Sequence, residues 1–129
     1  MVYLRPSWLQ RKLEPMFMTR LPNQPYIRVR GRTSGQLRSI PVRPLQVGDS
    51  WYLVSLPGNS NWARNLRASG SAELVEQGEA RSITVTEVFG DEQATAVAEY
   101  LASSTYRPTI KLLSERLPDP ADHPVFRID

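Results

Sequence analysis

Cysteine is absent from the 129 residues, and histidine occurs once, as His123. Without cysteine the chain has no disulfide, no thiolate nucleophile and no cysteine-ligated zinc or iron–sulfur site. A single histidine cannot build a histidine-rich metal site, and hydrolytic triads of the usual kind are not expected. The commonest metal and nucleophilic chemistries are therefore excluded.

Long apolar runs are also missing. The longest is a few residues around Trp51 to Val54, whereas a helix needs about 20 apolar residues to cross a bilayer. The first residues lack the apolar region of a signal peptide. We therefore expect a soluble, cytoplasmic protein.

The composition is that of one folded unit. At 129 residues and 14.6 kDa, the chain falls in the usual range of about 100 to 150 residues for one domain. Hydrophobic residues make up 40% and charged residues 22%, close to the averages for globular proteins. We expect a single domain over residues 1–129, with no internal repeat.

Charge is distributed unevenly along the chain. Residues 1–43 carry nine basic residues against Glu14 alone, although the net charge of the whole chain is only +3. Of the 16 basic residues, 14 are arginine, whose planar guanidinium matches phosphate and carboxylate geometry. The first third therefore favours an anionic partner: nucleic acid, acidic lipid or a phosphorylated cofactor.

Short strands joined by turns dominate the pattern. The predicted strands are residues 26–30, 37–47, 51–56, 73–76 and 79–88. The predicted helices lie within residues 1–19, at 62–68, after Asp91 and after Pro108. In the helix that Asp91 caps, the residues predicted to face inward are Ala94, Val97, Ala98 and Leu101. Pro41 and Pro44 make their strand an edge or bulged strand. The expected fold is α+β, a small antiparallel barrel of five or six strands with helices over its openings.

The most informative segment is residues 31–38, Gly-Arg-Thr-Ser-Gly-Gln-Leu-Arg, which we call the arginine turn. Gly31 and Gly35 allow backbone conformations that direct amide groups toward one point, and Arg32 and Arg38 bracket the turn with positive charge. Such a concavity would hold a phosphate. A solvated basic hairpin turn is the alternative.

A second segment, residues 55–68, places Trp62 and Asn65 three residues apart and so on one helix face. An indole can pack against a flat ring, and an amide can bond a ring carbonyl or nitrogen. The alternative is that Trp62 plugs one end of the barrel while Asn65 faces solvent.

Taken together, the two segments resemble a known family. The order GR-x-S-G-x-x-R-x-x-P, then S-x-x-G, then W-x-x-N-L-x-A, with a terminal His-Pro-Val-Phe-Arg, resembles the deazaflavin-dependent nitroreductases, split β-barrel oxidoreductases that use coenzyme F(420). Thr33 stands where family members often have lysine.

The resemblance implies a flavin-sized cofactor in a groove, its phosphate at the arginine turn and its ring near the Trp-x-x-Asn helix. The implied cofactor-binding residues are Arg32, Thr33, Ser34, Gly35 and Arg38 around the phosphate, and Pro41, Val42, Ser55, Trp62 and Asn65 around the ring.

The implied reaction is hydride transfer to an apolar, electron-poor acceptor such as a quinone, an enone or a nitroaromatic compound. The cofactor would carry the chemistry, while the protein aligns the reactants and excludes water. The product also needs a proton. Solvent, Tyr106 or Ser55 would supply it, because a tyrosine with a pKa of about 10 is protonated at neutral pH.

Other functions stay open. Split barrels also bind flavin mononucleotide (FMN) or haem, and a carrier of cofactor or lipid needs no catalysis. A nucleic-acid platform is disfavoured because the arginines of residues 26–30 alternate with Ile27 and Val29 and no nucleic-acid module is present. The N-terminal helix could cover the acceptor or contact an anionic membrane. Exposed strand edges fit a monomer or a homodimer.

Overall fold

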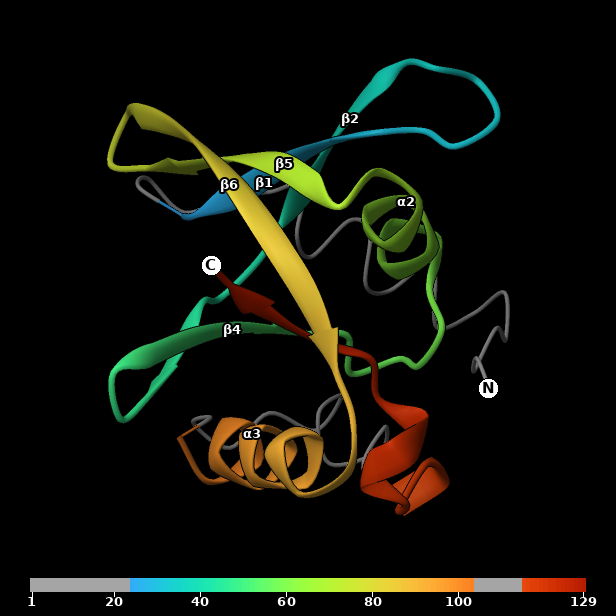
Figure 1. The fold of residues 1–129 in the computed structure, drawn as a ribbon, viewed down its shortest axis with the longest axis vertical. Coiled ribbons are helices and arrows are strands. Elements are labelled where there is room, and N and C mark those ends of the chain that lie inside the picture. Colours follow the sequence, from blue (N-terminus) through green and yellow to red (C-terminus); the bar gives the residue numbers. More distant parts are fainter. Residues whose placement is uncertain (1–23, 104–114) are drawn as a thin grey trace.

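The computed structural model describes residues 24–103 and 115–129. Over these residues the chain forms strands, two α-helices and a short 3-10 helix (Figure 1). In chain order they are β1 Tyr26–Arg30, β2 Leu37–Pro41, β3 Leu45–Val47, β4 Ser50–Val54, α2 Asn61–Ser69, β5 Ser71–Glu76, β6 Glu79–Val88, α3 Gly90–Ser103, the 3-10 helix Pro120–Asp122, and β7 Val125–Ile128.

All seven of these strands join one curled antiparallel sheet, in the order β2-β1-β5-β6-β7-β4-β3. Strand β6 belongs to both halves of the sheet, because residues 79–84 pair with β5 and residues 85–88 pair with β7. It crosses the molecule diagonally in Figure 1. The predicted α+β split barrel is confirmed, with seven strands rather than five or six.

The two additional strands have local causes. Proline cannot donate to a strand ladder, and Pro41 and Pro44 divide the predicted strand 37–47 into β2 and β3, which lie at opposite edges of the sheet. The terminal Val125–Ile128 pairs with β4 and β6 as β7. The prediction that the proline-bearing segment forms a sheet edge is confirmed.

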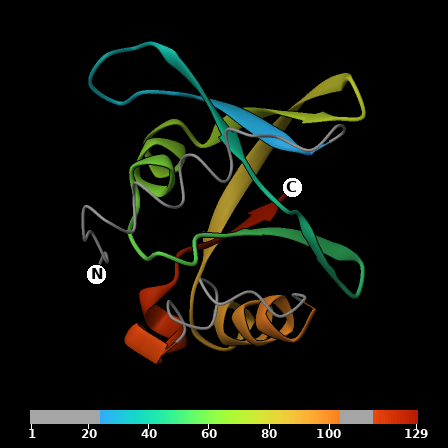
Figure 2. The same ribbon diagram turned by 180° about the vertical axis from the view of Figure 1, so that it is seen from behind.

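The two helices cover different parts of the sheet, as Figure 2 shows from behind. Alternation along β4 serves both, since Leu53 faces the α2 side while Tyr52 and Val54 face α3. The first core contains Ile27, Val29, Val42, Leu53, Ala63, Leu66, Leu74, Ile83 and Phe126. The second contains Leu45, Tyr52, Val54, Val88, Ala96, Val97 and Val125. Burial on both faces explains why residues 52–54 are all apolar, whereas Trp51 is exposed.

Helix α3 departs from the predicted pattern. It begins at Gly90 rather than being capped by Asp91, and it buries Gln93, Ala96 and Val97, while Ala98 is exposed. The reason is polar: Gln93 Nε2 donates to the carbonyl oxygen of His123 at 2.9 Å. Of the residues predicted to face inward, Val97 is buried and Leu101 packs against the second core, whereas Ala98 is exposed. A pattern of apolar residues cannot register the buried amide of Gln93.

His123 is a structural residue. Its side chain is buried, with Nδ1 2.7 Å from the carbonyl oxygen of Leu56 and Nε2 2.7 Å from that of Leu117. The ring thus ties the loop after β4 to the segment that leads into β7. Buried carbonyl groups need such partners, because an unsatisfied one is costly.

Three predictions concern other parts of the chain. The N-terminal helix within residues 1–19, with its membrane or acceptor contact, lies outside the described residues, as do Tyr106 and most of the helix after Pro108. In the described ranges, no helix is long and apolar enough to pass through a bilayer.

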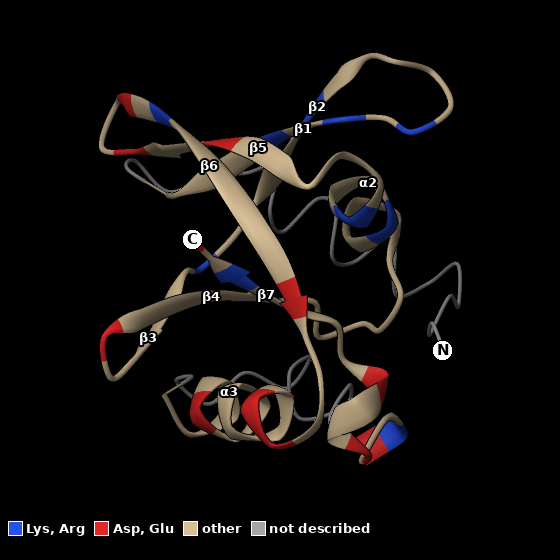
Figure 3. Cartoon of the chain, viewed as in Figure 1, with Lys and Arg blue, Asp and Glu red and all other residues tan. Residues whose placement is uncertain are grey.

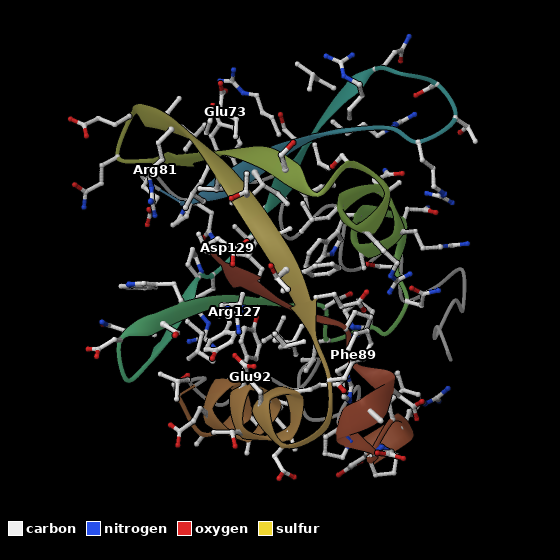
Figure 4. The ribbon with its side chains drawn as sticks, viewed as in Figure 1. Glu73, Arg81, Phe89, Glu92, Arg127 and Asp129 are labelled. Atoms are coloured by element: carbon white, nitrogen blue, oxygen red, sulfur yellow. The ribbon has the colours of Figure 1, made fainter. Side chains whose placement is uncertain are left out.

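A polar network joins α3 to the sheet. The Tyr52 hydroxyl donates to Glu92 Oε2 at 2.8 Å, and Arg127 Nη1 lies 3.1 Å from the same oxygen. Arg127 Nε is also 3.7 Å from Asp129 (Figure 4). The hydrogen bond from Tyr52, helped by Arg127, lowers the pKa of Glu92 below its ordinary value. Ionised Glu92 therefore stabilises the folded state.

We expect Glu92→Gln to lower the melting temperature at neutral pH and to have no such effect in acid. Because the pKa of Glu92 is lower in the folded chain than in the unfolded chain, its contribution is present above the unfolded pKa and is lost as pH falls through the folded one. Thermal unfolding between about pH 7 and about pH 3 measures the difference. Glu99→Gln, on the exposed side of the same helix, is the control. A difference from the parent that is constant with pH would contradict the prediction.

Candidate functional site

The arginine turn is closed by its own backbone. The N–H of Gly31 donates to the carbonyl oxygen of Gln36 at 2.8 Å, and the N–H of Gly35 donates to that of Gly31 at 3.0 Å. Gly35 has φ +71°, in the left-handed region that favours glycine. The Arg30 guanidinium donates to the Gly35 carbonyl oxygen. These bonds hold the turn between β1 and β2 in one shape.

A residue larger than glycine at position 31 would require the Ser34 side chain to move. A Cβ atom there would be 2.6 Å from Ser34 Oγ and 3.8 Å from Arg38 Nε. Ser34 Oγ in turn accepts from the N–H of Gln36 at 3.3 Å. The Ser34 hydroxyl and the Arg38 side chain therefore lie next to the backbone of Gly31, whose own N–H is bonded to Gln36.

Arg32 reaches across to helix α2. Its backbone N–H donates to Asn65 Oδ1 at 3.1 Å, and its Nη1 donates to the same oxygen at 2.7 Å. Nη1 also lies 3.4 Å from the carbonyl oxygen of Asn61. All of these acceptors are neutral, so the positive charge of Arg32 is not cancelled.

Arg38 is exposed on β2, opposite Val29 of β1. Cross-strand partners point to the same face of a sheet, so Arg38 lies on the face whose deeper part forms the first core. It makes no hydrogen bond or ion pair with any residue in the described ranges. It is free to bind an anion from solvent.

Acidic side chains are scarce at this end of the molecule. Residues 24–70 contain seven arginines and one acidic residue, Asp49. Figure 3 shows basic residues on the β1–β2 connection and α2, and acidic ones on α3 and the β5–β6 hairpin. Other arginines have carboxylate partners, for example Arg28 with Glu73 at 3.0 Å and Arg67 with Glu87 at 2.6 Å. Arg32 and Arg38 of the arginine turn have no carboxylate partner among the described residues, so their positive charge is available to a ligand.

Ser55 anchors the start of α2. Its side chain is fully buried, and its hydroxyl donates to the Gly58 carbonyl oxygen at 2.6 Å. Ser60 Oγ, 2.8 Å away, therefore donates to Ser55 and accepts from the N–H of Ala63 as the helix N-cap. This position fixes the helix and leaves the Ser55 hydroxyl with its proton already engaged.

The predicted ring-lining residues divide between surface and core. Trp62 is half-buried, its ring 6.3 Å from that of Phe126, and it packs against the first core, to which Val42 belongs. Pro41 ends β2, and the N–H of Val42 donates to the carbonyl oxygen of Pro25 at 3.0 Å. Trp62 therefore packs against the core at this end of the barrel and remains partly exposed.

The structure brings the two predicted segments together. Arg32 and Asn65, 33 positions apart in the sequence, are in direct contact. Thr33, between Arg32 and Ser34, is exposed. Asn65 was predicted to border a ring or, alternatively, to face solvent; it is buried, and its carbonyl oxygen accepts from Arg32. Sequence reasoning missed this contact, because neither spacing nor composition reports a tertiary contact.

The comparisons with known proteins begin with a family model. The model described as F420H(2)-dependent quinone reductase matches residues 5–108. That span contains the arginine turn and all of α2. No curated protein matches the sequence.

Solved structures share the fold at low identity. A structure of an F420-H2 dependent reductase, FDR-A, is 16% identical, with a TM-score of 0.61, over 81% of this chain and 92% of its own. A domain-swapped dimer is 15% identical, with a TM-score of 0.61, over 95% and 98%. HutZ, a haem storage protein from Vibrio cholerae, is 12% identical, with a TM-score of 0.57, over 94% and 89%. At such identities these likenesses show the fold alone.

Proposed function

Because the chain belongs to the F420H(2)-dependent quinone reductase family, and is therefore an oxidoreductase that uses coenzyme F(420), we propose that its arginine turn and helix α2 form the coenzyme site and that its acceptor is an apolar, electron-poor small molecule. Quinones, enones and nitroaromatic compounds are the acceptor classes. The observation that carries the proposal is the pair Arg32 and Arg38, left without acidic partners in the described structure beside the Trp62 helix.

The residues present fit this coenzyme. Its phosphate needs cationic donors, which Arg32 and Arg38 provide, with the Ser34 hydroxyl beside them. Its flat ring needs an apolar surface, which the partly exposed Trp62 provides at the edge of the first core, with Val42 buried in that core. FMN, the alternative, also carries a phosphate and a flat ring, so selectivity has to be measured.

When bound in reduced form, the coenzyme supplies the hydride. Arg32 and Arg38 neutralise the phosphate charge and fix one end of the ligand. Trp62, with Val42 in the core near it, would orient the ring and exclude water from it. We propose solvent or the Tyr106 hydroxyl as the source of the proton that the product takes up, since Ser55 already donates to the Gly58 carbonyl oxygen.

We expect the purified chain to bind oxidised coenzyme F(420) in a fluorescence titration at least tenfold more tightly than FMN. We also expect menadione to oxidise the reduced coenzyme only when the protein is present. FMN binding of equal strength would favour the FMN alternative. Binding without turnover of a quinone, an enone or a nitroaromatic compound would indicate a carrier. An unchanged rate in Tyr106→Phe would assign the proton to solvent.

A further inference from the structure

Asn65 is a buried amide in a helix face that otherwise packs the core. Its side chain is 5% exposed, and its neighbours Ala63 and Leu66 are fully buried in the first core. Burying an amide is unfavourable unless it is hydrogen-bonded. The partner that the fold gives to its carbonyl oxygen is Arg32, through the backbone N–H at 3.1 Å and Nη1 at 2.7 Å.

These contacts decide where the Arg32 guanidinium lies. An arginine on an exposed turn samples many rotamers, and a ligand that needs one of them has to order the side chain. Here Nη1 is held between Asn65 Oδ1 and the Asn61 carbonyl oxygen. Because the guanidinium is planar, fixing Nη1 also fixes the plane in which Nε and Nη2 donate. The cation is ordered before a ligand binds.

The acceptor is an amide, and this matters for charge. A carboxylate at position 65 would hold Arg32 equally well but would cancel its charge, as Glu73 does for Arg28 at 3.0 Å. An apolar residue would preserve the charge but release the side chain. Asparagine meets both requirements, since it accepts two hydrogen bonds and brings no charge.

We propose that Asn65 is a positioning residue, which acts on the coenzyme through Arg32 by holding its guanidinium beside the arginine turn with the charge intact. This inference rests on the proposed function, because it takes the phosphate of the coenzyme as the anion that Arg32 binds. It replaces the expectation that Asn65 borders the ring.

A double-mutant cycle tests the inference. The dissociation constant of oxidised coenzyme F(420) is measured for the parent, Arg32→Gln, Asn65→Leu and the double variant. We expect each single change to weaken binding about tenfold and the double variant to match Arg32→Gln within about threefold. Independent losses that multiply to about a hundredfold would show that Asn65 contacts the ligand itself, and would overturn the proposal.

Asn65→Asp separates positioning from a purely structural role, and it serves if Asn65→Leu does not fold. It keeps the acceptor oxygen, so the melting temperature should be at or above that of the parent. Coenzyme binding should still weaken at least tenfold, because the new carboxylate neutralises Arg32. Parent-like affinity in Asn65→Asp would overturn the proposal.

A matched control is available on the same segment. Asn59 Oδ1 accepts from Arg67 Nη1 at 3.0 Å, an amide–arginine contact that does not involve Arg32. Asn59→Leu should leave the affinity unchanged. If neither Arg32→Gln nor Arg38→Gln weakens binding, the proposed function fails; if both weaken binding but Asn65→Leu does not, the positioning role alone fails.

Discussion

Replacing Arg32 and Arg38 together with glutamine is expected to weaken coenzyme F(420) binding by at least about a hundredfold. A hydrogen bond to a charged group contributes about 1.5 to 3 kcal/mol, and 1.4 kcal/mol is a factor of ten. Each single replacement should therefore cost at least about tenfold. The effect on binding should be large because the described fold offers neither arginine a carboxylate partner, so that their charge is available to the phosphate. For the same reason, the replacements break no ion pair of the fold.

Fluorescence titration of the oxidised coenzyme measures this loss, and thermal unfolding checks that the variants remain folded. Arg81→Gln removes the same charge from the β5–β6 hairpin, where Arg81 is 3.9 Å from Glu76, and should leave the affinity near that of the parent (Figure 4). Affinity of the double variant within about twofold of the parent would refute the site, because the loss of even one charged contact to the phosphate should weaken binding by more than that. Parent binding should also weaken as salt rises.

Phe126→Ala is expected to have the largest effect on stability, lowering the free energy of unfolding by about 3 to 5 kcal/mol. Phe126 is 1% exposed in the first core and contacts the ring of Trp62. It lies on β7, opposite Leu53 of β4 and Glu87 of β6. Its removal would leave a cavity where both halves of the sheet and α2 meet, and neighbours in a close-packed core relax only in part.

Urea denaturation gives the free energy of unfolding. Phe89→Ala is the matched control, since the side chain of Phe89 is 62% exposed at the end of β6 (Figure 4). It should change stability by less than about 0.5 kcal/mol, as exposed substitutions usually do. If Phe126→Ala and Phe89→Ala lowered the free energy of unfolding equally, burial of Phe126 in the first core would not be the source of its effect on stability.

Local features of the fold could be predicted from local sequence. Strand β1 ends where it was predicted to end, and the Gln77-Gly78 turn joins β5 to β6. Helix α2 stops before Gly70, whose N–H donates to the carbonyl oxygen of Leu66. In each case the deciding residues are adjacent: alternating apolar side chains, a turn dipeptide, a glycine with φ +69°. The edge position of the proline-bearing strands could also be predicted locally, because proline lacks the backbone N–H that a strand needs for pairing on both sides.

Features that depend on distant partners could not be read in this way. The pattern of residues 125–128 does not reveal that β7 inserts between β6 and β4. The buried face of α3 is set by Gln93 and its bond to the His123 carbonyl oxygen, which hydropathy does not encode. At the site, the turn and the helix were predicted separately, while the bond from Arg32 to Asn65 needed the fold.

The position of β7 has a consequence for how the protein folds. Strand β7 is the partner that joins the β3–β4 hairpin to the rest of the sheet, because it pairs with β4 on one side and with residues 85–88 of β6 on the other. Any folding intermediate in which residues 125–128 have not yet paired leaves β4 and the end of β6 with open edges, on which chaperones can act.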